Sequence, residues 1–207
     1  MSNNELIHIA ECQDDNFQCN KLIPRPTGKN VMGSKWLFKN KINEQGQVII
    51  NKARLVCKRY SQIERLDYDE TFAPVAIMEA IRMFLAFACY HDFKVYQMDV
   101  KSSFLNGDLE EKVYMEQPEG FSLTDKHEYV CRLKKALYGL KQAPRAWYSR
   151  LDKYLQKQGF KKGGVDRNLY IKANEHDLLI VVVYVDDIMF GSNKDKLTKG
   201  FAEEMKS

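Results

Sequence analysis

The sequence predicts an α+β protein, and three segments lead to that prediction. Residues 34–60 hold two β-rich runs around a Gly-bearing turn, which is the pattern of an antiparallel hairpin. Residues 76–90 carry apolar side chains at helical spacing, which predicts an amphipathic helix. Residues 178–191 are almost wholly apolar apart from Asp186 and Asp187, so two buried strands are expected with both acids at the turn between them.

The composition is that of a globular protein, with 44% hydrophobic and 29% charged residues in a chain of 207. This length is enough for one sizeable domain or for two subdomains that share a core. No apolar run is long enough to span a membrane, and the N-terminus lacks the pattern of a secretory signal. The five cysteines lack a zinc-ligand spacing.

The first elements follow in order from the N-terminus. Residues 1–20 are polar and aperiodic, so a linker is expected there, and a loop follows at 24–28. The hairpin strands are then expected at 34–42 and 48–60. An acidic loop ends at Pro74, where the helix region begins.

Positive charge gathers on the hairpin. Lys52, Arg54 and Lys58 recur at every second residue, so on a strand all three point to one side. The formal net charge of the chain is only +4, but its cations crowd two segments, 29–59 and 134–150. This separation favours binding of a polyanion, and a solvent-facing hairpin surface explains the same pattern.

The helix predicted at 76–90 has five apolar residues at helical spacing, which are expected to face the core. These are Ile77, Ile81, Phe84, Leu85 and Ala88.

An alternating run at 93–99 predicts a strand that ends in Asp99. An acid in this place is either a simple cap or a functional group, because the following turn opens to solvent. Short strands are then expected at 112–116 and 129–133, separated from Asp99 by a turn at 106–107.

The C-terminal third predicts a helix that begins near Pro144 and stops at Gly159. A strand at 168–172 leads into the apolar hairpin, and residues 194–205 predict one more amphipathic helix.

A split β-α-β arrangement would place the strand that ends at Asp99 beside the apolar hairpin. Asp99, Asp186 and Asp187 would then meet at one rim of a sheet, where their mutual repulsion favours a bound cation. Hard oxygen ligands favour Mg²⁺ or Mn²⁺, and two such ions suit an in-line nucleotidyl transfer to a primer 3′-hydroxyl. The simpler reading is an Asp-Asp turn, because Asp is a common turn former.

Several motifs, in this order, make the sequence resemble the reverse transcriptase of Ty1/copia-type long-terminal-repeat retrotransposons. They are Lys35-Trp36-Leu37-Phe38-Lys39, Lys52-Ala53-Arg54-Leu55-Val56, Thr71-Phe72-Ala73-Pro74-Val75, 97–107, 113–118, 133–148 and Tyr184-Val185-Asp186-Asp187. The resemblance implies a polymerase right-hand fold with a fingers hairpin and a ferredoxin-like split βαβ palm. Fingers at 21–92 and a palm at 93–193 are expected, followed at 194–207 by the start of a helix that is truncated before a thumb.

The resemblance also implies roles for individual residues. Asp99, Asp186 and Asp187, with the Val100 carbonyl, would hold two Mg²⁺ or Mn²⁺ ions. Lys52 and Arg54 would hold the incoming triphosphate, where an Arg fork and a Lys charge suit phosphate oxygens.

Further roles concern the sugar and the base pair. Phe104 would lie beneath the sugar and exclude a 2′-hydroxyl, and the less favoured alternative is a core residue. Tyr138, Gly139, Gln142 and Pro144 would support the nascent base pair and the template, and packing explains Tyr138 and Gln142 about as well.

The sequence departs from the family pattern in two places. Arg59 stands where the family has a glycine, and the segment 163–168 lacks the usual Asp-Pro. No thumb, ribonuclease H, protease or integrase segment is recognised in the chain.

The function expected is therefore an RNA-directed DNA polymerase core, with a template, a primer and deoxynucleoside triphosphates as partners. The alternative is a catalytically silent remnant that at most binds nucleic acid or protein. An intracellular setting is expected, either cytoplasmic, within a virus-like particle if the parent element is intact, or nuclear. The sequence gives no indication of an oligomeric state.

Overall fold

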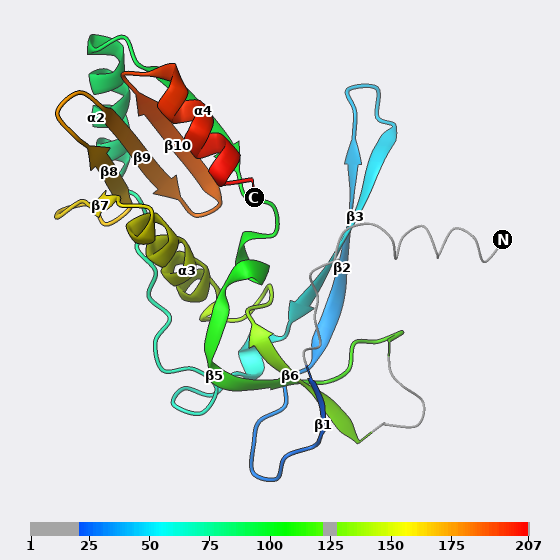
Figure 1. Cartoon of the computed structure of the whole chain (residues 1–207). Helices are drawn as coiled ribbons and strands as arrows, with labels where there is room; N and C mark the ends of the chain where they lie inside the picture. The colour runs from blue at the N-terminus through cyan, green and yellow to red at the C-terminus, as the bar shows by residue number, and fades with distance from the viewer. Residues whose placement is uncertain (1–20, 122–127, 207) are drawn as a thin grey trace. The chain divides into compact units, whose positions relative to one another are not determined.

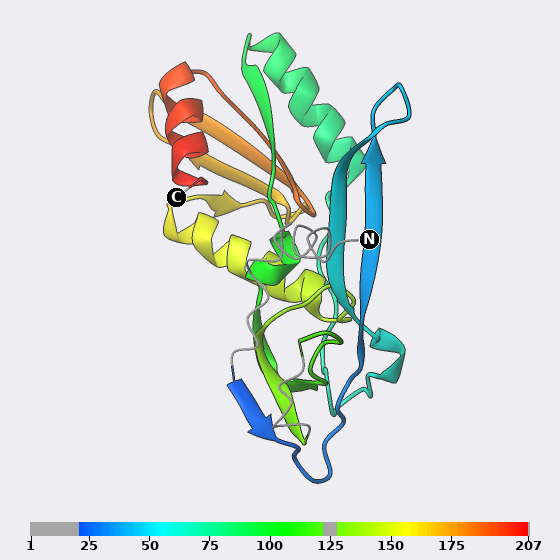
Figure 2. The same cartoon turned by 90° about the vertical axis from the view of Figure 1, so that its right-hand side faces the viewer.

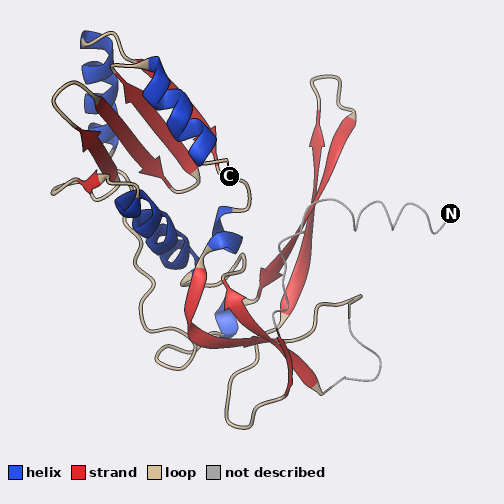
Figure 3. Ribbon diagram, viewed as in Figure 1, coloured by secondary structure: helices blue, strands red, loops and turns tan. Residues whose placement is uncertain are grey.

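A computed structural model describes residues 21–121 and 128–206, so the linker expected at 1–20 lies outside the described residues. The described residues form three antiparallel sheets and three α-helices, which confirms the predicted mixed fold (Figures 1 and 3). The chain divides into two compact units. Unit 1 comprises residues up to Phe72 together with Phe104–Trp147, and unit 2 comprises Ala73–Ser103 and Tyr148–Ser207. The fingers and palm boundaries and the right-hand arrangement stay predictions.

Unit 1 contains two sheets and two short 3₁₀ helices. One sheet has the strand order β1-β6-β5, and the other consists of β2 and β3. The elements are β1 (Lys21–Pro24), β2 (Ser34–Ile42), β3 (Val48–Cys57), η1 (Arg59–Ser61), β5 (Asp108–Met115) and β6 (Tyr129–Lys135). The helix η2 (Ser103–Asn106) begins at the boundary between the units.

The predicted hairpin is present as β2 and β3, which pair along their length (Figure 2). Ser34 lies opposite Cys57, and Asn40 lies opposite Asn51. Strand β3 ends at Cys57, so the last residues of the predicted second strand turn into η1 instead. Strand β1 was not predicted, because it has only four residues and the last of them is Pro24, which gives too little pattern to recognise.

The loop before α3 (Ala143–Lys157) packs tightly against β3 through Gly139. The amide of Cys57 donates a 2.7 Å hydrogen bond to the carbonyl of Tyr138. Gly139 has a φ of +91°, and a Cβ there would lie 2.3 Å from the Cys57 carbonyl oxygen. Only glycine satisfies both the positive φ and the close approach of the two backbones.

Unit 2 is built on a five-stranded sheet with the order β4-β10-β9-β8-β7. Its centre is apolar, since Val181, Val182 and Val183 of β9 are all buried, as the β-branched run predicts. The elements of this unit are α2 (Met78–Tyr90), β4 (Lys94–Asp99), β7 (Lys161–Lys162), β8 (Leu169–Ala173), β9 (Leu178–Tyr184), β10 (Asp187–Ser192) and α4 (Asp195–Glu204), together with most of α3.

Helices cover both faces of this sheet. On one face Phe84 of α2 packs against Gly191, where a Cβ would meet the ring at 3.2 Å. On the opposite face the ring of Phe190 lies 4.9 Å from that of Phe201 in α4. Residues of β10 alternate between these faces, which places Asp187 on the α2 face, in phase with Met189 and Gly191.

Helix α2 begins two residues later than predicted and buries less of its stripe. The amide of Ile77 donates to the Asp166 carboxylate at 3.0 Å, which fixes the chain just before the first turn. Phe84 and Ala88 are buried as expected, but Ile77 and Leu85 are 45% and 44% exposed, so their prediction as core residues was wrong. The buried face of α2 is narrower than the apolar face predicted from the sequence, because helical periodicity does not show how much of a helix its neighbours cover.

Helix α3 is fastened to β7 and β8 by a polar cluster around Asp152. Its carboxylate accepts hydrogen bonds from Lys162 at 2.7 Å and Tyr170 at 2.9 Å. Burial favours the neutral acid, but the bonds from Lys162, Gln156 and Tyr170 outweigh it and lower the pKa of Asp152. The cluster therefore holds an ionised carboxylate against the sheet.

Substituting Gly139→Ala should destabilise the protein by at least about 3 kcal/mol, because it adds backbone strain and a clash. The matched control is Gly28→Ala, where φ is +69° and a Cβ would meet nothing within 4 Å. That change should cost only about 1 to 2 kcal/mol. Urea unfolding followed by circular dichroism measures both, and equal losses would contradict the close approach.

Candidate active site

The two acids of the apolar hairpin lie at its solvent end. Val185 and Asp186 form the turn between Tyr184, the last residue of β9, and Asp187, the first residue of β10. Asp186 is exposed and Asp187 is half-buried. Val185 has a φ of +58°, a conformation that costs a β-branched residue about 1 to 3 kcal/mol. The pairing of β9 with β10 thus holds a strained turn that presents both acids to solvent.

Asp99 reaches the same end of the sheet from a distant part of the sequence. Strands β4 and β10 are antiparallel, and Asp99 lies directly opposite Asp187. Side chains opposite one another share a face, with Cβ atoms about 4.5 to 5.5 Å apart. The Val100 amide then donates a 2.9 Å hydrogen bond to the Asp186 carbonyl. The backbone therefore gathers the three acids at one end of the sheet.

The side chains themselves do not form a closed ligand cluster. Within residues 21–121 and 128–206, no group of three or more His, Cys, Asp or Glu side chains is arranged to hold a metal ion. One oxygen of Asp187 accepts a 2.8 Å hydrogen bond from the Gln97 amide nitrogen. Gln97 was not singled out from the sequence, although its position two residues before Asp99 puts it on the same face of β4.

The donor set nevertheless fits a divalent cation in its chemistry and in its backbone placement. Carboxylate oxygens and a backbone carbonyl are the ligands that Mg²⁺ and Mn²⁺ prefer. Two carboxylates placed directly opposite on a sheet repel each other, and a cation offsets that repulsion. The groups that would hold the cation are the carboxylates of Asp99, Asp186 and Asp187 and the carbonyl of Val100. Gln97 bonds to one oxygen of Asp187, so the other oxygen could bind the cation.

A second set of predicted residues comes together in unit 1. The guanidinium carbon of Arg54 lies 5.4 Å from the ring centre of Tyr138. The ring of Phe104 meets Tyr138 edge-on at 5.9 Å. Lys52 lies on the same face of β3 as Arg54, two residues before it. Three of the predicted substrate residues therefore form one contact chain.

The guanidinium of Arg54 has a hydrogen-bond donor without a partner among the described residues. Its Nε is buried, and no hydrogen-bond partner for it is found among the described residues. A buried donor without a partner is uncommon in native proteins and often marks a site that another group completes. An anion near Arg54 would satisfy it.

Phe104 and Gln142 have contacts that also suit a structural role. Phe104 is half-buried and packs against the core of unit 1. Gln142 is 0% exposed: its carbonyl accepts from Gln62 at 2.9 Å, and its amide nitrogen donates to the Asp67 carbonyl at 2.9 Å. The internal bonds of Gln142 tie its loop in place, and a role of that side chain toward substrate stays a prediction.

The thiol of Cys57 beside this loop is not a nucleophile. Burial, with a smaller contribution from Asp67, raises the pKa of Cys57 to about 12. The thiol therefore stays protonated at neutral pH, and only the thiolate is reactive. Its sulfur packs 3.6 Å from that of Met32 in the core.

The two departures from the expected pattern are accommodated locally. Arg59 lies exposed in η1 and does not have a positive φ, so no glycine is needed there. In the segment 163–168, Asp166 accepts the amide of Asn168 at 2.8 Å as well as that of Ile77. The aspartate thus organises its own turn without the proline.

Comparison with known proteins assigns the chain to a class of enzyme. The family model for reverse transcriptase (RNA-dependent DNA polymerase) matches residues 17–207. The chain belongs to the reverse transcriptase family.

The relatives found are Pol polyproteins of the Ty1/copia type. The chain is 42% identical to the retrovirus-related Pol polyprotein from transposon TNT 1-94 of Nicotiana tabacum, over 95% of this chain and 15% of that protein. It is 44% identical to the retrovirus-related Pol polyprotein from transposon RE2 of Arabidopsis thaliana, over 85% of this chain and 12% of that protein. It is 27% identical to the transposon Ty1-MR1 Gag-Pol polyprotein of Saccharomyces cerevisiae, over 98% of this chain and 11% of that protein. The chain thus spans about a seventh or less of the length of these relatives.

No helix within the described ranges has the length and apolar character to cross a membrane.

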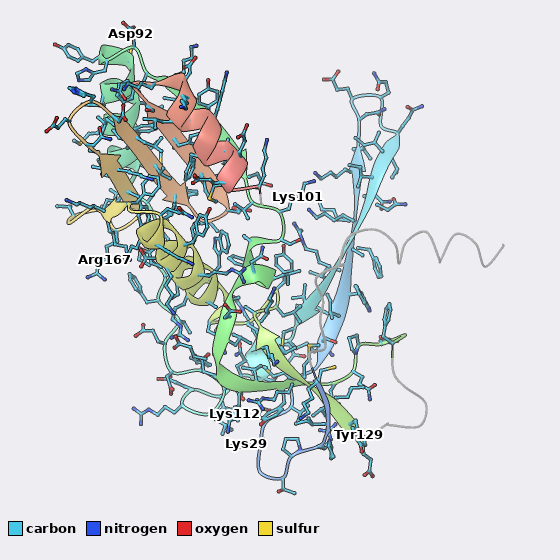
Figure 4. The ribbon with its side chains drawn as sticks, viewed as in Figure 1. Lys29, Asp92, Lys101, Lys112, Tyr129 and Arg167 are labelled. Atoms are coloured by element: carbon cyan, nitrogen blue, oxygen red, sulfur yellow. The ribbon has the colours of Figure 1, made fainter. Side chains whose placement is uncertain are left out.

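Asp187→Asn should weaken Mn²⁺ binding by about tenfold or more, because it removes one anionic ligand. Isothermal titration with MnCl₂ and the full chain measures the affinity. The matched control is Asp92→Asn, because Asp92 comes just before β4, whereas Asp99 is the last residue of that strand. Figure 4 labels Asp92 and also Lys101, which follows the end of β4. The same Mn²⁺ affinity in both variants would contradict a metal site at the hairpin turn.

Proposed function

We propose that the chain is the fingers and palm part of an RNA-directed DNA polymerase, which adds deoxynucleotides to a primer 3′-hydroxyl. The observation that carries the proposal is the register of β4 and β10, which sets Asp99 opposite Asp187 in a chain of the reverse transcriptase family. Neither the family nor the register would be enough separately. Together they supply a reaction class and a place for its ligands.

The residues of unit 2 would hold two divalent ions, Mg²⁺ or Mn²⁺, through Asp99, Asp186, Asp187 and the Val100 carbonyl. Such ions, when bound, neutralise charge on the phosphates and favour loss of the proton from the attacking hydroxyl. Gln97 would hold the Asp187 carboxylate by one oxygen, so that the other is directed to a ligand. The rigid ladder between β4 and β10 would keep the acids apart by a fixed backbone distance.

The residues of unit 1 would select and hold the incoming nucleotide. Lys52 and Arg54 would bind triphosphate oxygens, and the stacking of Arg54 on Tyr138 would limit the freedom of its guanidinium. Phe104, held edge-on by Tyr138, would occupy the space that a 2′-hydroxyl needs. Gln142 would act at a distance, by fixing the loop that carries Tyr138.

The partners of this activity would be an RNA or DNA template, its primer and deoxynucleoside triphosphates. The setting would be the cytoplasm, within a virus-like particle if the parent element is intact, or the nucleus. The alternative function is that of a silent remnant that binds nucleic acid or protein without chemistry. The two readings differ in a single outcome, which is metal-dependent incorporation.

Asp186→Asn should reduce nucleotide incorporation by about a hundredfold or more, since it removes charge stabilisation at the reacting phosphate. Primer extension on an RNA template with Mg²⁺ or Mn²⁺ measures the rate, and Asp92→Asn should leave it unchanged. Equal incorporation by the wild-type chain and Asp186→Asn would overturn the proposal and favour the silent remnant.

Phe104→Ala should relax the selection against ribonucleotides. Removing the ring opens room for a 2′-hydroxyl, so the ratio of kcat/KM for deoxynucleotide over ribonucleotide should fall by about 10- to 200-fold. Phe104→Leu keeps much of the bulk and should change the ratio less. Steady-state single-nucleotide extension measures both variants. An unaltered ratio in an active Phe104→Ala enzyme would make Phe104 a core residue only.

A further inference from the structure

The loop between β3 and α2 contains a polar segment that the proposed chemistry does not use. Residues 61–68 of this loop are called the brace, and they lie in unit 1 together with the turn 138–142. Gln62 and Asp67 of the brace are only 6% and 2% exposed, although both side chains are polar. Buried polar side chains are nearly always hydrogen-bonded, so the partners of these two residues indicate what the brace holds.

Two glutamine side chains join the brace to the turn 138–142. The backbone N–H of Lys141 donates to the side-chain carbonyl of Gln62 at 2.8 Å. The amide nitrogen of Gln62 donates to the side-chain carbonyl of Gln142 at 2.9 Å. The amide nitrogen of Gln142 in turn donates to the backbone carbonyl of Asp67 at 2.9 Å. These bonds form one continuous chain from the backbone of the turn to the backbone of the brace.

The direction of this chain of hydrogen bonds is fixed at both ends. A backbone N–H can only donate, and a backbone carbonyl can only accept. Neither glutamine amide can therefore turn over without setting two donors or two acceptors against each other. A mismatch of this kind is costly in a buried place, so the two glutamines hold the brace and the turn in one relative position.

The carboxylate of Asp67 gives the brace its own shape. Its Oδ2 accepts from the backbone N–H of Ile63 at 2.8 Å and from the amide nitrogen of Asn30 at 2.5 Å. Asn30 also donates to the Ser61 carbonyl at 2.6 Å. The brace is therefore closed on itself before it meets the turn.

The side chain of Lys141 makes a second connection between the two segments. Its ammonium group donates to the hydroxyl of Tyr68 at 2.9 Å. Lys141 is thus bound to the brace through its backbone and through its side chain.

The turn 138–142 needs such contacts, because it lies between β6 and α3 and belongs to neither. Its first residue, Tyr138, meets β3, where its carbonyl accepts from the Cys57 amide. The ring of Tyr138 contacts the Arg54 guanidinium and the ring of Phe104. The turn is therefore fixed from two sides, by β3 at one end and by the brace at the other.

We propose that Gln62 and Asp67 are positioning residues of the nucleotide site. They fix the turn 138–142 and thereby keep Tyr138 where it restrains Arg54 and Phe104, without touching the nucleotide themselves. This inference rests on the proposed function, because the placement of Arg54 matters to the reaction only if a nucleotide binds beside it.

Gln62→Met tests the role of the glutamine, because it removes both hydrogen bonds of Gln62 and keeps an unbranched side chain of similar length. Single-nucleotide primer extension should show a KM for the deoxynucleotide raised by about tenfold with kcat within about twofold of the wild type, since a displaced Arg54 weakens nucleotide binding throughout the reaction. A purely structural role would lower the folded fraction, and hence kcat, and leave KM unchanged.

The matched control is Gln117→Met, which makes the same change in the same unit. The Gln117 amide nitrogen donates to the Tyr129 carbonyl at 3.0 Å, away from the brace. This variant should keep the KM of the wild type.

Asp67→Asn is the conservative variant of the aspartate. Both side-chain bonds to Asp67 fall on Oδ2, so an asparagine oxygen in the same place can accept both. Asp67→Asn should therefore change KM by less than about twofold, whereas Asp67→Leu should raise it as Gln62→Met does. An equal rise in KM for the two Asp67 variants would contradict positioning through these bonds.

Hydrogen exchange gives a readout that needs no activity. Because the Cys57 amide bonds to the Tyr138 carbonyl, its exchange reports how firmly the turn is held. Gln62→Met should speed this exchange by about fivefold or more, and Gln117→Met should not. Unchanged exchange in Gln62→Met would overturn the inference.

Failure of this inference can be told from failure of the proposed function. A wild-type chain that extends primers, with an unchanged KM in Gln62→Met, would reject the positioning role alone. A wild-type chain that extends no primer would reject the proposed function and the positioning role together, even if exchange at Cys57 responds to Gln62→Met.

Discussion

The antiparallel ladder between β4 and β10 is the constraint on which this account depends. It sets Asp99 opposite Asp187 and lets the Val100 amide bond to the Asp186 carbonyl. Two carboxylates in such a position destabilise the pair of strands, so the ladder has to be maintained by burial behind it. The buried valines of β9 and the helices on both faces of the sheet supply that burial. The core of unit 2 therefore stabilises an end of the sheet at which the carboxylates of Asp99 and Asp187 repel each other.

Unit 1 follows a different principle, since its hairpin of β2 and β3 is a two-stranded ribbon with little core of its own. Alternation along β2 and β3 gives the ribbon a cationic face and an aromatic face. Its inner end is held by Leu55 and Cys57, which are buried, and by Gly139, which lets the following loop approach the strand. The ribbon can thus expose rings and charges outward because its base is anchored.

Much of this architecture could be predicted from the sequence, and the exceptions have physical causes. The apolar run broken by Asp186 and Asp187, and the Gly-bearing turn of the first hairpin, are local patterns and gave the right strands. Strand β1 and the exposure of Ile77 and Leu85 depend on tertiary neighbours, which no local pattern contains. The same holds for the bond from Gln97 to Asp187 and for the burial of Gln142: both require the strand register or the fold of a loop. The ring contact of Trp36 with Phe121 likewise needs Phe121 to be brought to β2 from a distant segment.

The most direct test of the central claim is an anomalous difference map from crystals of the chain grown with Mn²⁺. We expect a peak in contact with the carboxylates of Asp99 and Asp187 at the end of the β4 and β10 ladder, with Asp186 beside it. A map in which manganese binds elsewhere, or in which Asp99 points away from Asp187 and shares no ion with it, would contradict the account.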